Sequence, residues 1–259
     1  MADLRVVSLC PSLTETLVAL GVTPIAITRY CLRPREALRS VPKIGGTKNP
    51  DLDRIRSLKP DLVVANAEEN RPEDIRELGR SFPVHVSLPR TVAEVPGVVR
   101  DLARAVDRRE TGEALAAEIE SAIAPPPERV FRYAYFIWKD PWMTISADTY
   151  VSDLFRYAGG VNVFAESAER YPHVTPAKVA AATPDVLFFA SEPFPFSEGH
   201  RPAIEEAFGG ESPIEFVDGD DCCWHGARTI RGLALMRKIA KRFAAAGGAH
   251  FPPNSTEGL

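Results

Sequence analysis

Residues that could do chemistry are concentrated near the end of the chain, where Asp218 to Ile230 reads DGDDCCWHGARTI. Two adjacent cysteines, Cys222 and Cys223, are followed at once by Trp224 and His225. Thiolate and imidazole are common zinc ligands, so one hypothesis is a direct metal-ion site at Cys222, Cys223 and His225. No CxxC pair or second cysteine cluster accompanies them, and we favour the interpretation that both thiols are small buried groups at a strand end.

Signatures of catalysis are scarce in the rest of the chain. There is no GxSxG elbow, no Walker loop and no GxGxxG after a predicted strand. Glu68 and Glu69 are adjacent, so in an extended segment they point in opposite directions and do not form an acid–base pair. We therefore expect no enzyme and no cofactor of its own. A cytoplasmic enzyme or sensor on the same framework remains an alternative.

The elements that must position these residues alternate between apolar runs and helical patterns. In the first half, residues 4–10, 24–31, 61–66 and 83–88 are predicted strands separated by helices, the first helix beginning at a Ser12–Glu15 capping box. Residues 91–124 are predicted to form two helices and no strand. Beyond a run of three prolines, strands are predicted at 129–138, 142–147, 185–191 and 213–219, with helices at 150–158, 177–182 and 228–246. This alternation is typical of mostly parallel sheets covered by helices.

The two halves of the chain resemble each other weakly. The segment 58–68, LKPDLVVANAE, has a counterpart in 182–192, ATPDVLFFASE, and each half contains a strand, a polar loop, a helix and a glycine in that order. Two matches in the same order indicate an internal duplication. We predict an α/β fold with an N-terminal lobe at 1–90, a connecting helical region at 91–127 and a C-terminal lobe at 128–259.

Aromatic residues gather in the loops expected to follow the strands. All three tryptophans lie in such loops, and all three are in the second half of the chain. In open parallel sheets ligands bind at the carboxyl ends of the strands, and two facing Rossmann-like lobes would form a cleft there. Each aromatic taken alone is more often a packing residue, but their concentration favours a large, flat, partly apolar ligand.

Composition limits the partners of the 259-residue chain. A net charge of −4 gives no reason to expect nucleic acid, and no apolar run is long enough to span a membrane. The first residues, MADLRVVSLCPS, lack the pattern of a signal peptide, so we expect a cytoplasmic protein, or a periplasmic one if a leader has been removed. The four cysteines are expected to be free thiols, and the protein a monomer.

Several strings resemble one known family. SLCPSLTETLVALG, TRYCLRP and KIGGTKNPDLDRIRSLKPDLVVANAEENRPEDIREL are similar to the first lobe of the class III periplasmic-binding-protein fold, also called the helical backbone metal receptor. IWKDPWMTISADTYVSDLFRYAGGVNVF, RYPHVTP, SEPFPF and WHGARTI are similar to its second lobe. The family includes vitamin B12-binding and ferric siderophore-binding proteins of ABC importers.

The resemblance implies a non-enzymatic binding protein for a metal chelate. A corrinoid such as cobalamin is the first choice, with a ferric siderophore or haem as alternatives. Tyr30 and His225 would be the axial contacts to an exposed metal centre. The implied ligand-binding residues are Ser12, Glu15, Tyr30, Gly46, Thr47, Glu69, Trp138, Trp142, Asp148, Tyr171, Phe194, Trp224 and His225.

Importer-coupled members of the family dock onto an ABC permease through one surface glutamate on each lobe. Glu73 and Glu205 each lie near the start of a helix and are the candidates for this contact. A carboxylate at a helix start is also explained by the helix dipole alone, which is the commoner reason for one. A permease partner is expected only if the protein is exported.

Overall fold

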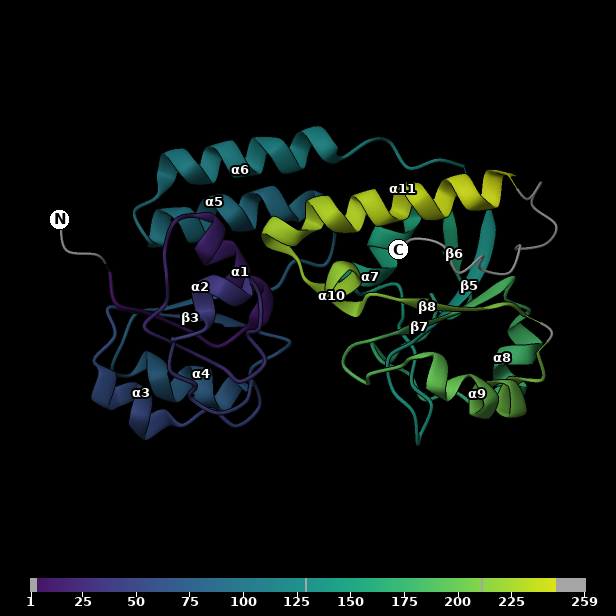
Figure 1. Ribbon diagram of the computed structural model, residues 1–259, viewed down its shortest axis with the longest axis horizontal. Helices are drawn as coiled ribbons and strands as arrows, with labels where there is room; N and C mark the ends of the chain where they lie inside the picture. The colour runs from purple at the N-terminus through teal and green to yellow at the C-terminus, as the bar shows by residue number, and fades with distance from the viewer. Residues whose placement is uncertain (1–3, 129, 211, 246–259) are drawn as a thin grey trace. The chain divides into compact units, whose positions relative to one another are not determined.

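The computed structural model describes residues 4–128, 130–210 and 212–245 (Figure 1). Arg129, the first residue of a predicted strand, and Ala246, the last of the predicted closing helix, lie outside these ranges. Contacts divide the chain into two compact units. The first comprises Met1–Pro89, Ala93–Ala122 and Trp224–Ile230, and the second Arg90–Val92, Ile123–Cys223 and Arg231–Leu259.

The first unit contains a four-stranded sheet in the order β2-β1-β3-β4, in which every neighbouring pair is parallel. Its strands are β1 (Val6–Ser8), β2 (Ala26–Ile27), β3 (Leu62–Asn66) and β4 (Val84–Ser87). Its helices are α1 (Pro11–Ala19), α2 (Arg35–Leu38), α3 (Leu52–Leu58), α4 (Pro72–Gly79), α5 (Val95–Ala105) and α6 (Arg109–Ala122). The 3-10 turn η1 (Val92–Glu94) before α5 begins in the second unit and ends in the first.

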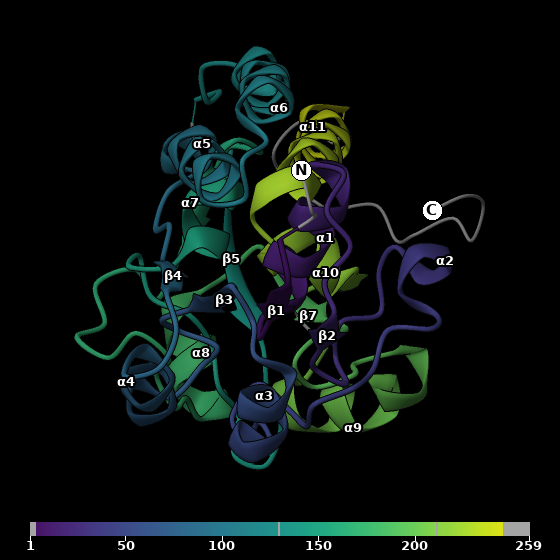
Figure 2. The same cartoon turned by 90° about the vertical axis from the view of Figure 1, so that its left-hand side faces the viewer.

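The inner strands β1 and β3 are buried on both faces, which explains why they are mostly apolar runs, whereas the edge strand β4 alternates valine with polar residues and is partly exposed. Val6 and Val64 pack with α1 and α5 on one face, while Val7 and Val63 pack with α3 and α4 on the other. The two layers of helices are seen on either side of the sheet in Figures 1 and 2. Helix α6 lies along α5, where a Cβ on Gly112 would come within 2.1 Å of the Ala103 Cβ. Glycine is therefore required at 112 for the two helices to approach this closely.

The second unit contains a second four-stranded parallel sheet, in the order β6-β5-β7-β8. Its strands are β5 (Phe131–Phe136), β6 (Gly160–Asn162), β7 (Val186–Ala190) and β8 (Ile214–Val217). The helical segments of the remaining chain are α7 (Tyr150–Arg156), α8 (Pro176–Ala182), η2 (Glu198–His200), α9 (Arg201–Phe208), α10 (Gly219–Cys223), η3 (Gly226–Arg228) and α11 (Thr229–Ala245).

Aromatic rings fill the core of the second unit. Phe136 and Phe189 on neighbouring strands stack at 4.6 Å on the face that packs with α8 and α9. On the other face Phe131 stacks on Phe243 of α11 at 3.8 Å, and Tyr133 lies 4.7 Å from Phe155 of α7. Ring pairs at these distances add stabilisation beyond the apolar area that they bury.

The structure confirms the prediction of two α/β units with parallel sheets, and the duplication is visible in the strand order. If the strands of each unit are numbered along the chain, both sheets read 2-1-3-4. Helices α3 and α8 both end in a non-glycine residue with left-handed backbone, Lys59 at φ 45° and Thr183 at φ 47°. Each of these residues directly precedes the Pro-Asp of the repeated sequence motif.

Local predictions failed where backbone chemistry overrides the hydrophobic pattern. Helix α1 begins at Pro11 rather than at a Ser12 cap, because the fixed φ of proline suits the first helical position. Residues 142–147 form no strand; Met143 makes only isolated bridges to Trp138 and His173. Strand β6 was not predicted, since Gly160-Val161-Asn162 is too short and glycine-rich to show an alternating pattern.

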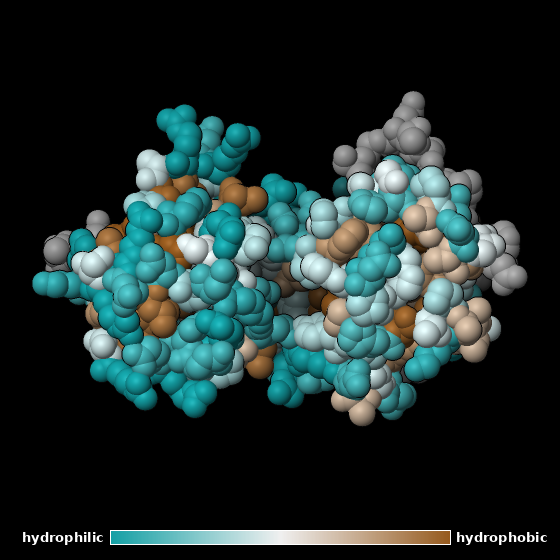
Figure 3. Space-filling model, turned by 90° about the horizontal axis from the view of Figure 1, so that it is seen from below, coloured by the Kyte–Doolittle hydropathy of each residue, from teal (hydrophilic) through white to brown (hydrophobic). Residues whose placement is uncertain are grey.

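None of the helices in the described part of the chain combines the length and apolar composition that a bilayer crossing needs. On the face drawn in Figure 3, hydrophilic residues cover most of each unit, and apolar residues appear singly or in small groups.

Candidate functional site

The first unit places polar side chains where β1 and β3 end. Because these strands are parallel neighbours, their carboxyl ends lie at the same edge of the sheet. Asn66, the last residue of β3, is buried, and its Oδ1 accepts hydrogen bonds from the backbone N–H groups of Glu68 at 2.9 Å and Glu69 at 3.1 Å. These two donors fix the orientation of the Asn66 amide, so its NH2 group must point the other way.

The Asn66 NH2 group meets a histidine from the distant end of the sequence. Nδ2 of Asn66 lies 3.1 Å from Nε2 of His225, and Oγ of Ser12 lies 3.4 Å from the same nitrogen. Since an amide NH2 can only donate, Nε2 must accept, and the neutral ring carries its proton on Nδ1. Burial lowers the pKa of His225 to about 4, which keeps the imidazole neutral near pH 7.

The two hydrogen bonds to Nε2 make His225 a poor axial ligand for a metal in this structure. Its only nitrogen with an available lone pair, Nε2, already accepts two hydrogen bonds, and the residue is 5% exposed. A metal could reach Nε2 only if the contacts to Ser12 and Asn66 were broken. In this structure His225 therefore positions neighbouring groups and presents almost no surface to solvent.

The short segment Trp224–Ile230 is fastened to α1 by further polar contacts. Arg228 makes a two-bond ion pair with Glu15, at 2.7 Å from Nε and 2.6 Å from Nη2. The same guanidinium lies 5.0 Å above the ring of Trp224, which is 5% exposed. Glu15 and Trp224 were both predicted to contact ligand, but here they engage Arg228.

A second asparagine fixes the loop that carries Gly46 and Thr47. Nδ2 of Asn70 donates to the carbonyl oxygens of Leu9 and Thr47, each at 3.0 Å, while its Oδ1 accepts from the Asn66 backbone N–H at 2.9 Å. Asn70 thus ties the ends of β1 and β3 to the loop 45–49. Gly46 and Thr47 are themselves buried.

The accessible groups at this edge are Tyr30 and Glu69. Tyr30 follows β2 and is 50% exposed, with the Arg29 guanidinium 5.6 Å from its ring centroid. A Cβ on Gly46 would lie 3.3 Å from the Tyr30 ring, so the ring rests against this glycine. Glu69 is exposed to solvent at its surface. The surrounding protein nevertheless desolvates its carboxyl, which raises the pKa, and the Lys48 ammonium opposes that rise.

The strand ends of the second unit are aromatic. Trp138 follows β5, is 41% exposed and lies edge-on to Phe194 at 5.6 Å. Phe194 contacts Phe196 at 4.5 Å, and Phe196 is parallel to Trp142 at 6.2 Å. Trp138 and Phe194 thus form the outer part of a continuous aromatic cluster that reaches the core. Trp142 is only partly buried but belongs to the packed part of it.

Asp148 lies between two arginines of the second unit. Its carboxylate is 3.2 Å from Nη1 of Arg90 and 2.7 Å from Nη1 of Arg170. The guanidinium of Arg170 also lies 5.9 Å from the ring centroid of Tyr171. Asp148 and Tyr171, two predicted contact residues, are therefore brought together by an arginine that sequence reasoning did not single out.

The cysteines behave as packing residues. Cys222 and Cys223 lie on the short helix α10 rather than at a strand end, and none of the four cysteines is in a disulfide. Burial raises the pKa of the Cys10 and Cys222 thiols, so both stay protonated. Among the described residues no group of three or more His, Cys, Asp or Glu side chains could hold a metal ion, which removes support from a direct site at Cys222, Cys223 and His225.

The predicted docking glutamates are accessible. Glu73 lies in the first turn of α4 with its side chain 60% exposed and 3.6 Å from Nε of Arg71. Glu205 is exposed on α9.

Sequence reasoning missed Asn66, Asn70 and Arg228, which organise the first unit's strand ends. Asn66 and Asn70 were visible as the first and last residues of NAEEN, at the end of the predicted strand 61–66. Arg228 gave no comparable signal, because its partner Glu15 lies 213 residues away.

The chain is similar to known proteins over most of its length. A family model described as periplasmic binding protein matches residues 6–208. The chain belongs to this family. It is 30% identical over 193 residues to a vitamin B12-binding protein of Vibrio parahaemolyticus, covering 71% of this chain and 70% of the relative.

Two solved structures share the fold of this family member. The periplasmic vitamin B12 binding protein BtuF of Vibrio cholerae superposes with a TM-score of 0.81 at 23% identity, covering 93% of this chain and 98% of the other. The periplasmic heme-binding protein RhuT from Roseiflexus sp. RS-1 gives 0.79 at 22% identity, covering 93% and 99%. At such identities these likenesses establish the fold alone.

Proposed function

We propose that the protein binds a corrinoid of the vitamin B12 type reversibly and releases it unchanged. The observation that carries the proposal is the similarity to vitamin B12-binding proteins, which extends over more than two thirds of both chains. The strand ends of both units support it, because they combine exposed aromatic rings with a few polar groups, as sites for large apolar ligands do.

In this proposal the accessible residues touch the ligand and the buried ones hold them. Tyr30 and Glu69 of the first unit and Trp138 and Phe194 of the second present surface to solvent at strand ends. Asp148 is exposed as well and is held by Arg90 and Arg170. The remaining predicted residues act from beneath or beside these groups: Ser12, Glu15, Gly46, Thr47, Trp142, Tyr171, Trp224 and His225.

Equilibrium dialysis against cyanocobalamin tests the proposal. We expect a dissociation constant in the micromolar range or tighter, and recovery of intact cyanocobalamin after denaturing the complex. Trp138→Leu should weaken binding at least tenfold, since a buried aromatic contact contributes about 1.4 kcal/mol or more. Absence of binding at tens of micromolar cyanocobalamin would refute the proposal.

Tyr157→Leu is the matched control. Tyr157 caps the end of α7 that leads away from the strand-end loops, and it is also a partly exposed aromatic residue. Its replacement should leave the affinity for cyanocobalamin unchanged. An equal loss in both variants would show that the Trp138 effect is general destabilisation.

Haem is a second candidate, favoured by one observation. Tyr30 as a residue is 50% exposed, and tyrosinate is an established haem-iron ligand. If haem is the ligand, Tyr30→Phe should change the absorption spectrum of the bound haem as well as its affinity. An unchanged spectrum in the variant would exclude Tyr30 as axial ligand.

Membership of the periplasmic binding protein family also supports a role in the import of the bound ligand. We infer a periplasmic location, the second of the two expected from the sequence, since the matched family is one of periplasmic binding proteins and nothing in the comparisons supports the cytoplasm. A monomer that delivers ligand to an ABC permease through Glu73 and Glu205 is the corresponding model. Glu73→Ala with Glu205→Ala should leave cyanocobalamin affinity unchanged and reduce uptake in cells carrying the cognate permease.

A further inference from the structure

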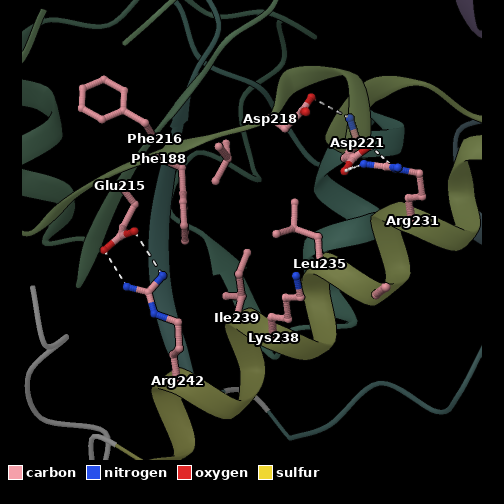
Figure 4. A pocket seen from close by; sticks show the side chains of 12 residues that line it. Phe188, Glu215, Phe216, Asp218, Asp221, Arg231, Leu235, Lys238, Ile239 and Arg242 are labelled. Carbon is pink, nitrogen blue, oxygen red and sulfur yellow. Dashed lines mark hydrogen bonds and ion pairs between the residues drawn. The ribbon is translucent and has the colours of Figure 1, made fainter. Parts of the chain in front are cut away.

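A cavity of about 410 Å³ lies in the second unit between α11 and the edge strand β8, away from the aromatic cluster described above (Figure 4). Strand β8 is at the edge of the sheet, and within the described residues no strand pairs with its outer side. Helix α11 packs over one face of the sheet next to this edge. A volume of this size lies within the range of pockets that hold small molecules.

The middle of the cavity is apolar. The register of β7 and β8 places Phe188 opposite Glu215, and Val217, two residues further on, faces the same side of the sheet. Leu235 and Ile239, one turn apart on α11, line the cavity from the opposite wall. An alkyl chain lying along α11 would therefore contact apolar atoms on two sides.

Each end of the cavity holds an ion pair between α11 and the wall. Arg242 binds Glu215 through two bonds, at 2.9 and 3.2 Å, and Arg231 binds Asp221 at 3.0 Å. The two arginines are eleven residues apart, so they lie about 16 Å apart along the helix axis. Burial raises the pKa of Glu215, and the Arg242 guanidinium opposes that rise. The cavity is thus elongated, with polar ends and an apolar centre.

Lys238 supplies a further positive charge between the two pairs. Whereas Arg231 and Arg242 each hold a carboxylate, Lys238 forms no hydrogen bond or ion pair within the described ranges of the chain. Its side chain lines the cavity beside Leu235 and Ile239 (Figure 4). An anionic group bound here would meet a cation that is not already neutralised by a neighbouring carboxylate.

We propose that this cavity binds a small, elongated anionic amphiphile of the medium-chain carboxylate class. The alkyl part lies on Phe188, Leu235 and Ile239, and the carboxylate meets the Lys238 ammonium. This site is distinct from the strand-end surfaces and does not depend on the corrinoid proposal.

Titration of the ¹⁵N-labelled protein with decanoate, followed by amide chemical shifts, tests the site. We expect saturable shifts centred on Val217, Leu235 and Lys238. Octanoate should bind about fifteenfold more weakly, since each buried methylene contributes about a factor of four. Decyltrimethylammonium, which has a similar chain and the opposite charge, should bind more weakly than decanoate.

Lys238→Gln should weaken decanoate binding at least fivefold, while Lys241→Gln, a change to an exposed lysine outside the cavity, should not. Equal affinities of the two variants, or decanoate shifts centred elsewhere, would overturn the proposal. Competition between decanoate and cyanocobalamin would also overturn it, because it would place decanoate on the strand-end surface. Cyanocobalamin affinity should be the same in Lys238→Gln, so this site and the corrinoid site can fail independently.

Discussion

In both units an arginine and an aspartate fix the start of the central strand through the same set of contacts. Oδ2 of Asp61 accepts from the Arg5 backbone N–H at 2.8 Å, and Oδ2 of Asp185 accepts from that of Arg132 at 2.6 Å. Each arginine also donates at 2.8 Å to the last carbonyl oxygen of the helix that precedes the aspartate, Leu58 of α3 or Ala182 of α8. The amino ends of the two sheets are therefore built alike.

The carboxyl ends of the strands differ. The first unit places a network of asparagine, serine and neutral histidine there, and the second places packed aromatic rings. Duplicated backbone chemistry thus preserves the framework, while the carboxyl ends of the strands have diverged. The difference predicts that the second unit is most sensitive to loss of an aromatic ring, and the first unit to loss of an ion pair or to acid.

The largest effect should come from removing an aromatic ring from the second unit. Phe189→Ala deletes a fully buried ring that contacts Phe136 at 4.6 Å and should reduce the free energy of unfolding by about 3–5 kcal/mol. Val63→Ala in the central part of the first sheet, also fully buried, should cost only about 2 kcal/mol. Urea denaturation followed by circular dichroism gives both values. Equal costs would remove the contrast between the two cores.

The next largest effect should come from breaking the buried ion pair between Arg228 and Glu15 in the first unit. Arg228→Ala leaves the Glu15 carboxylate without its two-bond partner and should cost about 3 kcal/mol, because the Arg228 and Glu15 side chains are only 3% and 17% exposed. Arg80→Ala is the control, since that side chain is 77% exposed in its pair with Glu77 and its loss should cost under about 1 kcal/mol. A loss below about 1 kcal/mol for Arg228→Ala would contradict a structural role.

The neutral histidine makes the first unit sensitive to acid. The pKa of His225 falls from 6.5 to about 4 on folding, so the unfolded chain takes up the proton more readily. Its contribution is fully present above pH 6.5 and is lost as the pH falls towards 4, by up to about 3 kcal/mol. His225→Gln should flatten the dependence of unfolding free energy on pH in this window. A slope as steep as in the parent protein would show that other groups cause it.

The smallest effects should be the same in both units. Lys59→Gly and Thr183→Gly each replace a residue in left-handed backbone and should stabilise the protein by about 0.5–1 kcal/mol. Thermal unfolding measures both. Opposite signs at these equivalent positions would show that the duplicated motif is not energetically equivalent in the two halves.

The sequence was informative where local rules operate. Pro-Asp before an apolar run predicted β3 and β7, and the apolar runs predicted buried strands because a parallel sheet covered on both faces requires them. Helices α5 and α6 were likewise predicted as two helices.

The candidate site was less predictable, because its contacts join residues far apart in the chain. Nothing in the string around Ser12 indicates that its hydroxyl meets His225, 213 residues away. The resemblance to the family named Tyr30 and Trp138, which are exposed, together with Trp224, whose burial depends on the docking of its segment. Burial at a site is a tertiary property that a strand-end position does not specify.

The segment Trp224–Ile230 also has a consequence for the order of folding. It belongs to the first unit, although the other residues of that unit all precede Ile123 in the chain. During synthesis about a hundred intervening residues leave the ribosome before His225 can reach Asn66 and Arg228 can reach Glu15. The first unit, although most of it is translated early, is therefore completed only after strands β5 to β8 of the second unit have been made, and until then the carboxylate of Glu15 and the amide of Asn66 lack these partners.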